Sequence, residues 1–318
     1  MKLAAFLLAA FLVCVLPVLL AVPFTNEADA PIATTTPTEL ATTPVPVIED
    51  LVMIYDEGIV RSVPVEAYIT CVVLAEMPAS FEMEALKAQA VVARTYTYRR
   101  IEQPKHNEAA VCTDAACCQA YISVVDYIAD GGTMDSVNRI AQAVTETSGR
   151  VMTYQGTYIE ATYFSCSGGR TEDAAAVWGS DVPYLQSVDS PGEENATHYT
   201  DTVRLTAKEF CEKIGYQPSG PVETWVGQVR YTKGGGVSDI QIGEKTFSGT
   251  NLRKCLNLRS TAFVVTAVGD MVTITTKGFG HRVGMSQYGA DAMAVMGSSY
   301  QEILCHYYQG AELTNVAG

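Results

Sequence analysis

Glu76 is the residue whose type and position most clearly suggest chemistry. It closes an apolar run, VPVEAYITCVVLAEMP, at residues 63–78. At about 100° per residue, Glu76 falls on the same face of a predicted helix over 65–76 as Ile69 and Val72. Burial and the negative end of a helix both disfavour an ionised carboxylate, and a carboxyl with a raised pKa is the usual general acid. A solvated glutamate in the last helical turn fits the same spacing, so both interpretations stay open.

Two basic residues lie on the next predicted helix, over residues 80–100. Lys87 and Arg94 are seven positions apart and therefore share one helical face. Basic side chains beside an acidic catalyst can bind the polar groups of a ligand, which makes both residues candidate substrate-binding groups. A solvated basic face is the alternative.

A cluster of histidine and cysteine follows in HNEAAVCTDAACCQ. His106, Cys112 and Cys118 are evenly spaced by six positions, and Cys117 is a spare thiol. One imidazole and two thiolates suit tetrahedral zinc, although the spacing is not that of a standard zinc finger. A Cys112–Cys118 or Cys112–Cys117 disulfide is the alternative, because an exported protein can form one.

The elements that must position these residues are helical first and strand-like later. Helical periods dominate residues 65–145, and strand-like runs follow at 151–165, 225–233, 238–247, 261–268 and 271–278. Helical patterns return near the C-terminus. This partial segregation predicts an α+β domain with a substrate cleft.

Composition limits the classes of partner. The chain has 318 residues, of which 48% are apolar and 18% charged, so it can bury a core. Its formal net charge is −14. Without a basic stripe to neutralise phosphates, the sequence argues against nucleic acid as a partner.

The N-terminus predicts a membrane anchor. No charge occurs from Leu3 to Phe24, and this length suffices to span a bilayer. Lys2 precedes the run, so we expect a single-pass protein of the cell membrane whose C-terminal domain is exported. A cleaved signal peptide is the competing interpretation. The predicted organisation is an anchor at 1–24, a Thr/Pro-rich linker at 25–50 and an extracytoplasmic catalytic domain at 51–318.

Three long segments carry a resemblance to a known family. Residues 63–96, 163–188 and 278–313 resemble, in the same order, the signature segments of the stage II sporulation protein D family. The resemblance implies a lytic transglycosylase that cleaves peptidoglycan glycan strands during engulfment in endospore formation. It also implies that the glutamate of the family's EMP motif, here Glu76, is the catalytic acid.

One carboxylate suffices for this implied reaction, whereas ordinary glycosidases use two. Glu76 would protonate the leaving glycosidic oxygen. It would then take the proton of the muramic acid C6 hydroxyl as that oxygen closes onto C1, which leaves a 1,6-anhydro end.

The other segments supply groups suited to a polar sugar. Ser165 and Ser167 lie close to Gly168 in SCSGGRTED, where a turn allows close backbone approach. The alternative is a tight turn after a strand that has no role in binding. The remaining candidates share a place in the strand before this turn or in GFGHRVGMSQYGA: Tyr163, His281, Ser286, Gln287 and Tyr288. Arg282 stands where the family more usually has a small residue.

The resemblance also bears on the metal and on partners. Some members of the family carry zinc on one histidine and two cysteines, an arrangement that His106, Cys112 and Cys118 match. The implied role of one Zn²⁺ ion is structural. The implied substrate is denuded glycan, with the amidase stage II sporulation protein P and the scaffold protein M as partners at the membrane.

Two other functions stay open. Related proteins enhance an amidase without cleaving the wall themselves, and a zinc-dependent wall hydrolase would use the metal to activate water. Product analysis separates the three functions, since they leave anhydro ends, no cleavage and reducing ends, respectively.

Overall fold

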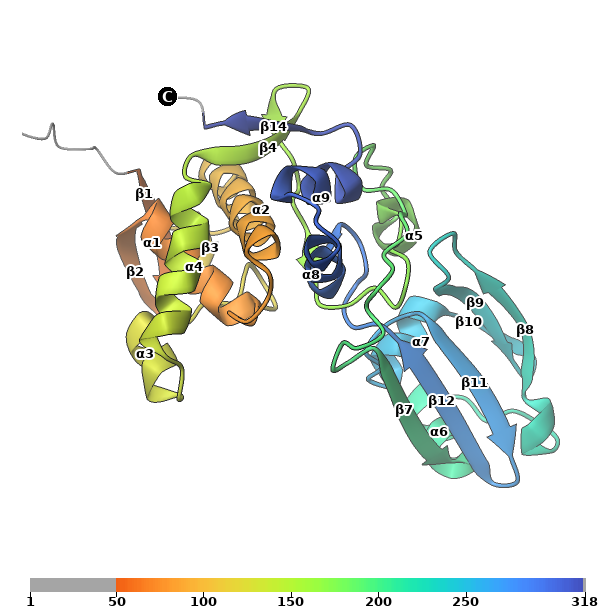
Figure 1. Ribbon diagram of the computed structural model, residues 1–318. Coiled ribbons are helices and arrows are strands. Elements are labelled where there is room, and N and C mark those ends of the chain that lie inside the picture. Colours follow the sequence, from red (N-terminus) through yellow and green to blue (C-terminus); the bar gives the residue numbers. More distant parts are fainter. Residues whose placement is uncertain (1–49, 317–318) are drawn as a thin grey trace, which may run out of the picture. The chain divides into compact units, whose positions relative to one another are not determined.

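The computed structural model describes residues 50–316, and its hydrophobic interior is divided between two cores. The first core is built by segments from both ends of this range, whereas the second core is built by residues between 200 and 277. Figure 1 shows the elements of the first core in orange to green and in dark blue, and those of the second core in teal to mid blue.

The first core is surrounded by these elements: β1 (Leu51–Asp56), β2 (Ile59–Pro64), α1 (Val65–Glu76), α2 (Met83–Glu102), β3 (Val111–Cys112), α3 (Val124–Ala129), α4 (Met134–Glu146), β4 (Arg150–Tyr154), β5 (Thr157–Tyr158), β6 (Tyr163–Phe164), α5 (Ala174–Trp178), β13 (Met285–Ser286), α8 (Gln287–Val295), α9 (Tyr300–Tyr307) and β14 (Glu312–Asn315). The second core is surrounded by β7 (Thr200–Thr206), α6 (Ala207–Ile214), the 3₁₀ helix η1 (Val222–Thr224), β8 (Val226–Tyr231), β9 (Val237–Ile242), β10 (Lys245–Ser248), α7 (Gly249–Cys255), β11 (Phe263–Val268) and β12 (Met271–Lys277).

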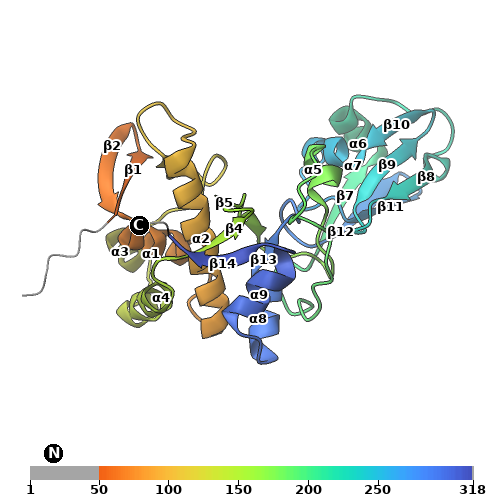
Figure 2. The ribbon, with the colours of Figure 1, turned by 90° about the horizontal axis from the view of Figure 1, so that it is seen from above.

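Helix α2 is the centre of the first core. It packs against α1, α4, α8, α9 and β4, and Figures 1 and 2 show it among these elements. Ala85, Ala88, Ala90 and Ala93 on α2 are fully buried. Their small side chains allow neighbouring backbones to approach closely, which is how one helix contacts so many elements. The predicted helix over 65–76 is confirmed by α1, and the next helix begins at Met83.

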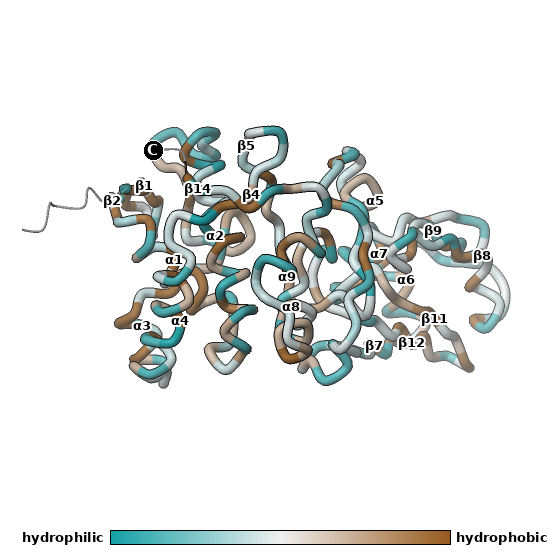
Figure 3. The backbone as a smooth tube through the Cα atoms, turned by 45° about the horizontal axis from the view of Figure 1, so that its top comes forward, coloured by the Kyte–Doolittle hydropathy of each residue, from teal (hydrophilic) through white to brown (hydrophobic). Residues whose placement is uncertain are grey.

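The C-terminal part of the chain returns to the first core. β13 pairs in parallel with β6, and β14 pairs antiparallel with β4. Figure 3 shows a hydrophobic stretch at β4, the strand that pairs with β14. This return places residues near 285 beside residues near 163, which the site requires.

The second core lies among two three-stranded sheets, ordered β11-β12-β7 and β10-β9-β8, and the helices α6 and α7. The strand-like runs of the sequence correspond to β4–β6 and β8–β12. β1, β2 and β7 were not predicted. Because β1 and β2 precede the helices, the segregation of helices and strands along the chain is only partial.

The expected membrane location is corrected by the structure. In the described range, no helix is both long and apolar enough to cross a bilayer. α2 has 20 residues, but it carries charged residues along its length and packs inside the protein core. The structure therefore gives no support to a single-pass protein of the cell membrane. The expected anchor at 1–24 and the linker up to residue 49 lie outside the described residues.

Candidate active site

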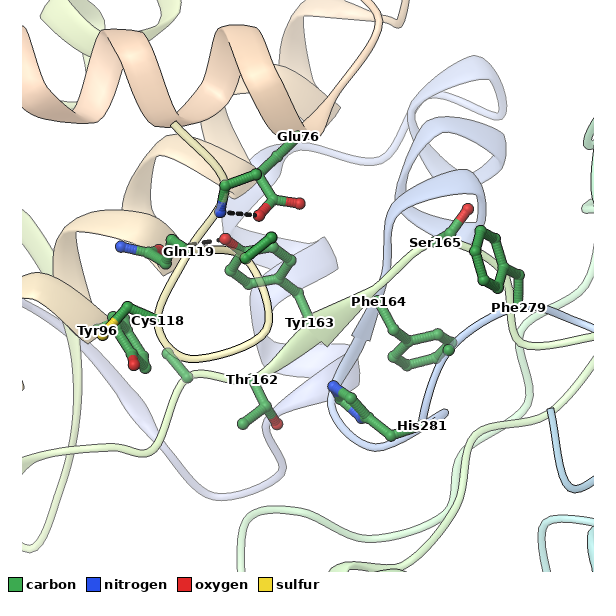
Figure 4. Close-up of a pocket in the computed structure, with 14 residues that line it drawn as sticks. Glu76, Tyr96, Cys118, Gln119, Thr162, Tyr163, Phe164, Ser165, Phe279 and His281 are labelled. Atoms are coloured by element: carbon green, nitrogen blue, oxygen red, sulfur yellow. Dashed lines mark hydrogen bonds between the residues drawn. The ribbon is translucent and has the colours of Figure 1, made fainter. Parts of the chain in front are cut away.

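A pocket of about 400 Å³ lies where α1 ends, next to β6. Its walls come from the end of α1, the segment 115–120, the segment 161–165 and the segment 279–281. Figure 4 shows the side chains that line it. Of the predicted site residues, Glu76, Tyr163, Ser165, His281 and Cys118 line this pocket.

Glu76 is the last residue of α1, and Met77 leaves the helix in an extended conformation. The Ala120 N–H donates to Glu76 Oε1 at 2.8 Å, and Gln287 Nε2 lies 3.5 Å from Oε2. The Tyr163 hydroxyl also lies beside Glu76, but it donates its proton to Gln119 Oε1 at 3.2 Å. Burial raises the pKa of Glu76 above its ordinary value, although the polar groups of Ala120, Tyr163 and Gln287 act in the opposite direction. The carboxyl therefore keeps its proton more readily than a solvated glutamate does.

Tyr163 and Gln287 reach Glu76 because β6 and β13 pair. The register places Met285 opposite Tyr163 and Ser286 opposite Phe164. Ser286 then caps α8, since its Oγ accepts from the Gly289 N–H at 3.2 Å. Gln287 is the first residue of α8, so the cap fixes its position over Glu76.

Two of the predicted residues on this segment have packing roles and do not line the pocket. Ser286 is fully buried and serves as the helix cap. The Tyr288 ring packs edge-on against Phe81, with ring centroids 5.0 Å apart. Ser165 lines the pocket and also accepts, through its carbonyl, from the Tyr288 N–H at 3.1 Å.

Two further residues around Glu76 were missed by the sequence analysis. Ala120 contributes only its backbone N–H, which no side-chain pattern reveals. Gln119 Oε1 accepts from the Tyr163 hydroxyl at 3.2 Å and so fixes the tyrosine beside Glu76.

His281 forms part of the opposite wall as a neutral imidazole. The Val283 N–H donates to its Nδ1 at 3.1 Å. Its ring packs near Phe164 and Trp178, with centroids 5.6 Å and 5.4 Å away. Burial, together with the charge of Arg253, lowers the pKa of His281 to about 4. His281 thus packs against β6 through Phe164.

The CSGG turn lies in the interior, and its donors are already used. Ser167 is fully buried. Glu193 Oε2 accepts from Ser167 N at 2.7 Å, from Ser167 Oγ at 2.9 Å and from Gly168 N at 3.0 Å. The prediction that Ser167 and Gly168 bind substrate is therefore corrected, because a buried glutamate occupies the groups assigned to the sugar.

Lys87 and Arg94 are also placed away from the pocket. Lys87 Nζ pairs with Glu84 Oε1 at 2.7 Å and with Glu146 Oε2 at 2.8 Å. Arg94 is fully buried, and it donates to both carboxylate oxygens of Glu66, at 2.8 Å and 2.6 Å. Both basic side chains stabilise the packing of α2, which corrects their prediction as substrate-binding groups.

Arg282, the departure from the usual family pattern, ties several loops together. It has a positive φ of 67°, unusual for a residue other than glycine. Its guanidinium donates to the Ser167 carbonyl at 2.6 Å, to Glu172 Oε1 at 3.1 Å and to the Gly234 carbonyl at 2.6 Å. These bonds hold the loop that carries His281 in its strained conformation.

The His/Cys cluster has the donor set of a metal site. The ligand atoms of His106, Cys112, Cys117 and Cys118 all lie within 4.8 Å of one another. His106 Nε2 is 3.8 Å from Cys117 Sγ and 3.6 Å from Cys118 Sγ. One imidazole and three thiols match a tetrahedral zinc site. Cys117 therefore belongs to the cluster, whereas the even spacing of the other three residues predicted that it would not.

The thiols of the cluster differ in how readily they ionise. Burial opposes ionisation of Cys118, but hydrogen bonds from the Cys112 backbone and His106 outweigh it and lower its pKa to about 7. Burial raises the pKa of Cys112 to about 12. All eight cysteines among residues 50–316 are free, so the disulfide alternatives are not formed. Cys118 also lines the pocket, two residues before the Ala120 N–H that contacts Glu76.

Comparison with known proteins places the chain among sporulation and cell-wall proteins. The SpoIID family model, described as Stage II sporulation protein, matches residues 55–154. Stage II sporulation protein D of Bacillus subtilis (strain 168) is 40% identical over 264 residues, covering 80% of this chain and 76% of the relative. The protein of that name from Bacillus amyloliquefaciens is also 40% identical, covering 80% and 75%. An amidase enhancer of Bacillus subtilis (strain 168) is 31% identical, covering 76% of this chain and 39% of the relative.

Proposed function

This chain belongs to the stage II sporulation protein D family, and from that premise we propose that it cleaves peptidoglycan glycan strands as a lytic transglycosylase. Family membership supports a role in remodelling the cell wall during sporulation. The proposal adds the reaction, the acid and the product.

One observation carries the proposal. Among the described residues that line the pocket, Glu76 is the only acid. Hydrolysis by an ordinary glycosidase requires a second carboxylate within about 5–10 Å to attack or to activate water. A pocket with a single carboxyl suits an intramolecular reaction, in which the sugar supplies its own nucleophile.

The surroundings of Glu76 suit both proton transfers. In the first, protonated Glu76 donates to the glycosidic oxygen, which its raised pKa favours. The resulting carboxylate is stabilised by the Ala120 N–H and by Gln287 Nε2, which already contact its two oxygens. In the second, the carboxylate takes the proton of the C6 hydroxyl while that oxygen bonds to C1. The glutamate regains its proton and no water is consumed.

We propose a structural role for zinc at the cluster of His106 and three cysteines. When bound, the ion would supply four bonds that hold the segment 106–118 together. The segment continues into Gln119 and Ala120, so the cluster would fix the two groups that orient Tyr163 and Glu76. Four protein ligands would leave no position for water, which disfavours the zinc hydrolase.

A second candidate function is suggested by similarity to the amidase enhancer. A protein that only assists an amidase needs a wall-binding surface but no acid with a raised pKa. The environment of Glu76 therefore favours cleavage. Denuded glycan as substrate, and stage II sporulation proteins P and M as partners, remain part of the proposal and rest on family resemblance.

The test is a digest of purified glycan strands by the described domain, residues 50–316, with the products analysed by mass spectrometry. We expect 1,6-anhydro-muramic ends with wild-type protein and none with Glu76→Gln. Reducing ends would establish hydrolysis instead. No cleavage, with faster digestion when an amidase is added, would establish the enhancer function.

A further inference from the structure

Arg253, on α7, is the one half-buried arginine of residues 50–316 that has neither a carboxylate partner nor a second hydrogen bond. Arg139 and Arg150 also lack a carboxylate, but each donates to two oxygen acceptors. Arg94, Arg99, Arg100, Arg259 and Arg282 each pair with a carboxylate. Arg253 makes one hydrogen bond, from Nε to the Leu258 carbonyl at 3.3 Å, and no carboxylate in residues 50–316 lies within ion-pair distance of it. Burial lowers its pKa, with no acid to offset the effect. A partly desolvated cation without a counter-ion is costly for folding and calls for a ligand.

The surroundings of Arg253 form a basic pocket. Together with Thr250, Lys254, Asn257 and Leu258 it lines a pocket of about 350 Å³. Two of these five side chains are cationic and none is acidic, in a chain whose net charge is −14. The outer nitrogens of the Arg253 guanidinium have no partner within the described residues, so they are free to donate.

A backbone contact connects the wall of this basic pocket to the wall of the Glu76 pocket. The Leu258 carbonyl holds Arg253, and the carbonyl of the next residue, Arg259, accepts from the Gly280 N–H at 3.0 Å. Gly280 and His281 line the Glu76 pocket. Arg253 is close enough to His281 for its charge to help lower the pKa of that imidazole.

We propose that Arg253, assisted by Lys254, forms a subsite for a carboxylate on the glycan strand, bound on the His281 side of the Glu76 pocket. The inference rests on the proposed function, because it takes the ligand to be a glycan strand. In such a strand only muramic acid carries a carboxyl group, on its lactyl ether, and this group is a free carboxylate only where the stem peptide has been removed. A guanidinium whose two outer nitrogens are free can bind both oxygens of a carboxylate. The subsite would therefore select strands without stem peptides.

The test compares two ligands that differ only in the carboxyl group. One is a denuded glycan oligomer, and the other is the same oligomer with its lactyl carboxyls converted to amides. Binding is measured by calorimetry on the Glu76→Gln protein, so that neither ligand is cleaved. We expect amidation to weaken binding about 10-fold, and Arg253→Gln to abolish this preference. Arg204→Gln, which changes an exposed arginine on β7, should leave the preference intact.

Each other outcome has one meaning. If the protein that retains Arg253 binds both ligands with equal affinity, the proposed subsite is wrong. It is also wrong if Arg253→Gln weakens the binding of both ligands equally. If Arg253→Gln fails to fold, Arg253→Lys is used in its place. Lysine retains the positive charge but lacks the paired N–H groups of the guanidinium, so it should keep only part of the preference for the carboxylate ligand. Competition by inorganic phosphate without any preference between the glycans would indicate a free-anion site and overturn the proposal.

The same experiment separates this inference from the proposed function. If the protein prefers the carboxylate ligand but cleaves no glycan, the proposed transglycosylase activity is wrong and the proposed subsite is supported. Cleavage to anhydro ends by a protein without the preference would do the reverse.

Discussion

Glu76 and Glu193 are two sequestered carboxylates of the region around the first core, with opposite surroundings. Glu193 is 1% exposed, and its oxygens are saturated with donors: Oε2 serves Ser167 and Gly168, and Oε1 accepts from Ser190 Oγ at 2.6 Å. Glu76 has one short hydrogen bond, from the Ala120 N–H, and faces a pocket.

The number of donors decides what each carboxylate does. Glu193 is held by several short hydrogen bonds that define the turn, so its oxygens are not available to a ligand. Glu76 is sequestered enough to raise its pKa, yet it retains room for a sugar oxygen. A carboxylate close to saturation is part of the framework, whereas one left short of donors is available for chemistry.

The largest effect should come from Glu76→Gln. The amide keeps the shape and the Ala120 contact but cannot give up or take a proton in the way required. We expect the rate of glycan release to fall by about 10²–10⁴-fold. Release is followed by chromatography of soluble fragments. A rate within a few-fold of wild type would remove the distinction between the two glutamates.

Glu193→Ala should break the framework. Loss of this carboxylate leaves the buried N–H groups of Ser167 and Gly168 without an acceptor, so we expect a loss of about 3 kcal/mol in the free energy of unfolding. Urea titration measures it. Glu194→Ala is the matched control, because Glu194 is exposed, and it should cost no more than about 0.5 kcal/mol. Equal values for the two variants would contradict the comparison.

Cys117→Ser tests whether Cys117 is the fourth ligand of a zinc ion in the cluster near Glu76. If all four groups bind zinc, this variant should lose affinity for the ion by about 10-fold or more, as judged by competition with a chelator. Zinc content by elemental analysis and melting temperature with and without chelator provide the other readouts. Cys255→Ser, at an exposed cysteine on α7, should change none of them. Unaltered zinc affinity in Cys117→Ser would restore the three-residue set.

The pH dependence of stability sharpens the comparison further. The pKa of Glu76 is raised above 4.5 in the folded protein, so the folded state binds the proton more tightly than the unfolded state. Ionisation therefore destabilises wild type as pH rises through the folded pKa. Glu76→Gln should be more stable than wild type at neutral pH, and the difference should vanish below the pKa of the unfolded chain. A constant difference in unfolding free energy across pH would argue against a raised pKa.

The smallest effect should come from Lys87→Met. Its ion pairs join α2 to α4 near the surface, and we expect a cost of about 0.5–1 kcal/mol in stability with no change in glycan release. A tenfold fall in release at unchanged stability would return Lys87 to the substrate site.

These contrasts show what local sequence predicts. The helix over 65–76 and the position of Glu76 on its buried face follow from a 3.6-residue period and a terminating proline, both local features. The strand runs that became β8–β12 follow from the same kind of signal. The approach of Gln287 to Glu76 depends on the pairing of β6 with β13, which no local period encodes.

The wrong predictions concern residues whose contacts are with residues distant in the sequence. Ser167 and Gly168 have the composition of a ligand-binding turn, but their acceptor, Glu193, lies 25 and more residues away. Lys87 and Arg94 share a helical face, yet a helix packed on most sides has no solvated face to offer. Cys117 joins the cluster because the chain turns at this residue. Even spacing along the sequence does not reveal such a turn.

The Arg282 clamp has a consequence for how this sequence can vary. Glu172 Oε1 accepts from Arg282 and from the Gly236 N–H, at 3.1 Å and 2.9 Å. A Cβ on Gly236 would lie 2.3 Å from that oxygen, and a Cβ on Gly234 would lie 2.6 Å from Oε2. A Cβ on Gly234 would also lie 2.3 Å from the Thr171 carbonyl, so a smaller residue at 172 could make room at Gly236 but not at Gly234. Such a residue would also remove the carboxylate that pairs with the buried guanidinium of Arg282. Positions 172, 236 and 282 are therefore coupled: a small residue in place of Arg282 leaves the buried carboxylate of Glu172 without its cation, so we expect this exchange to be tolerated only where Glu172 has changed as well.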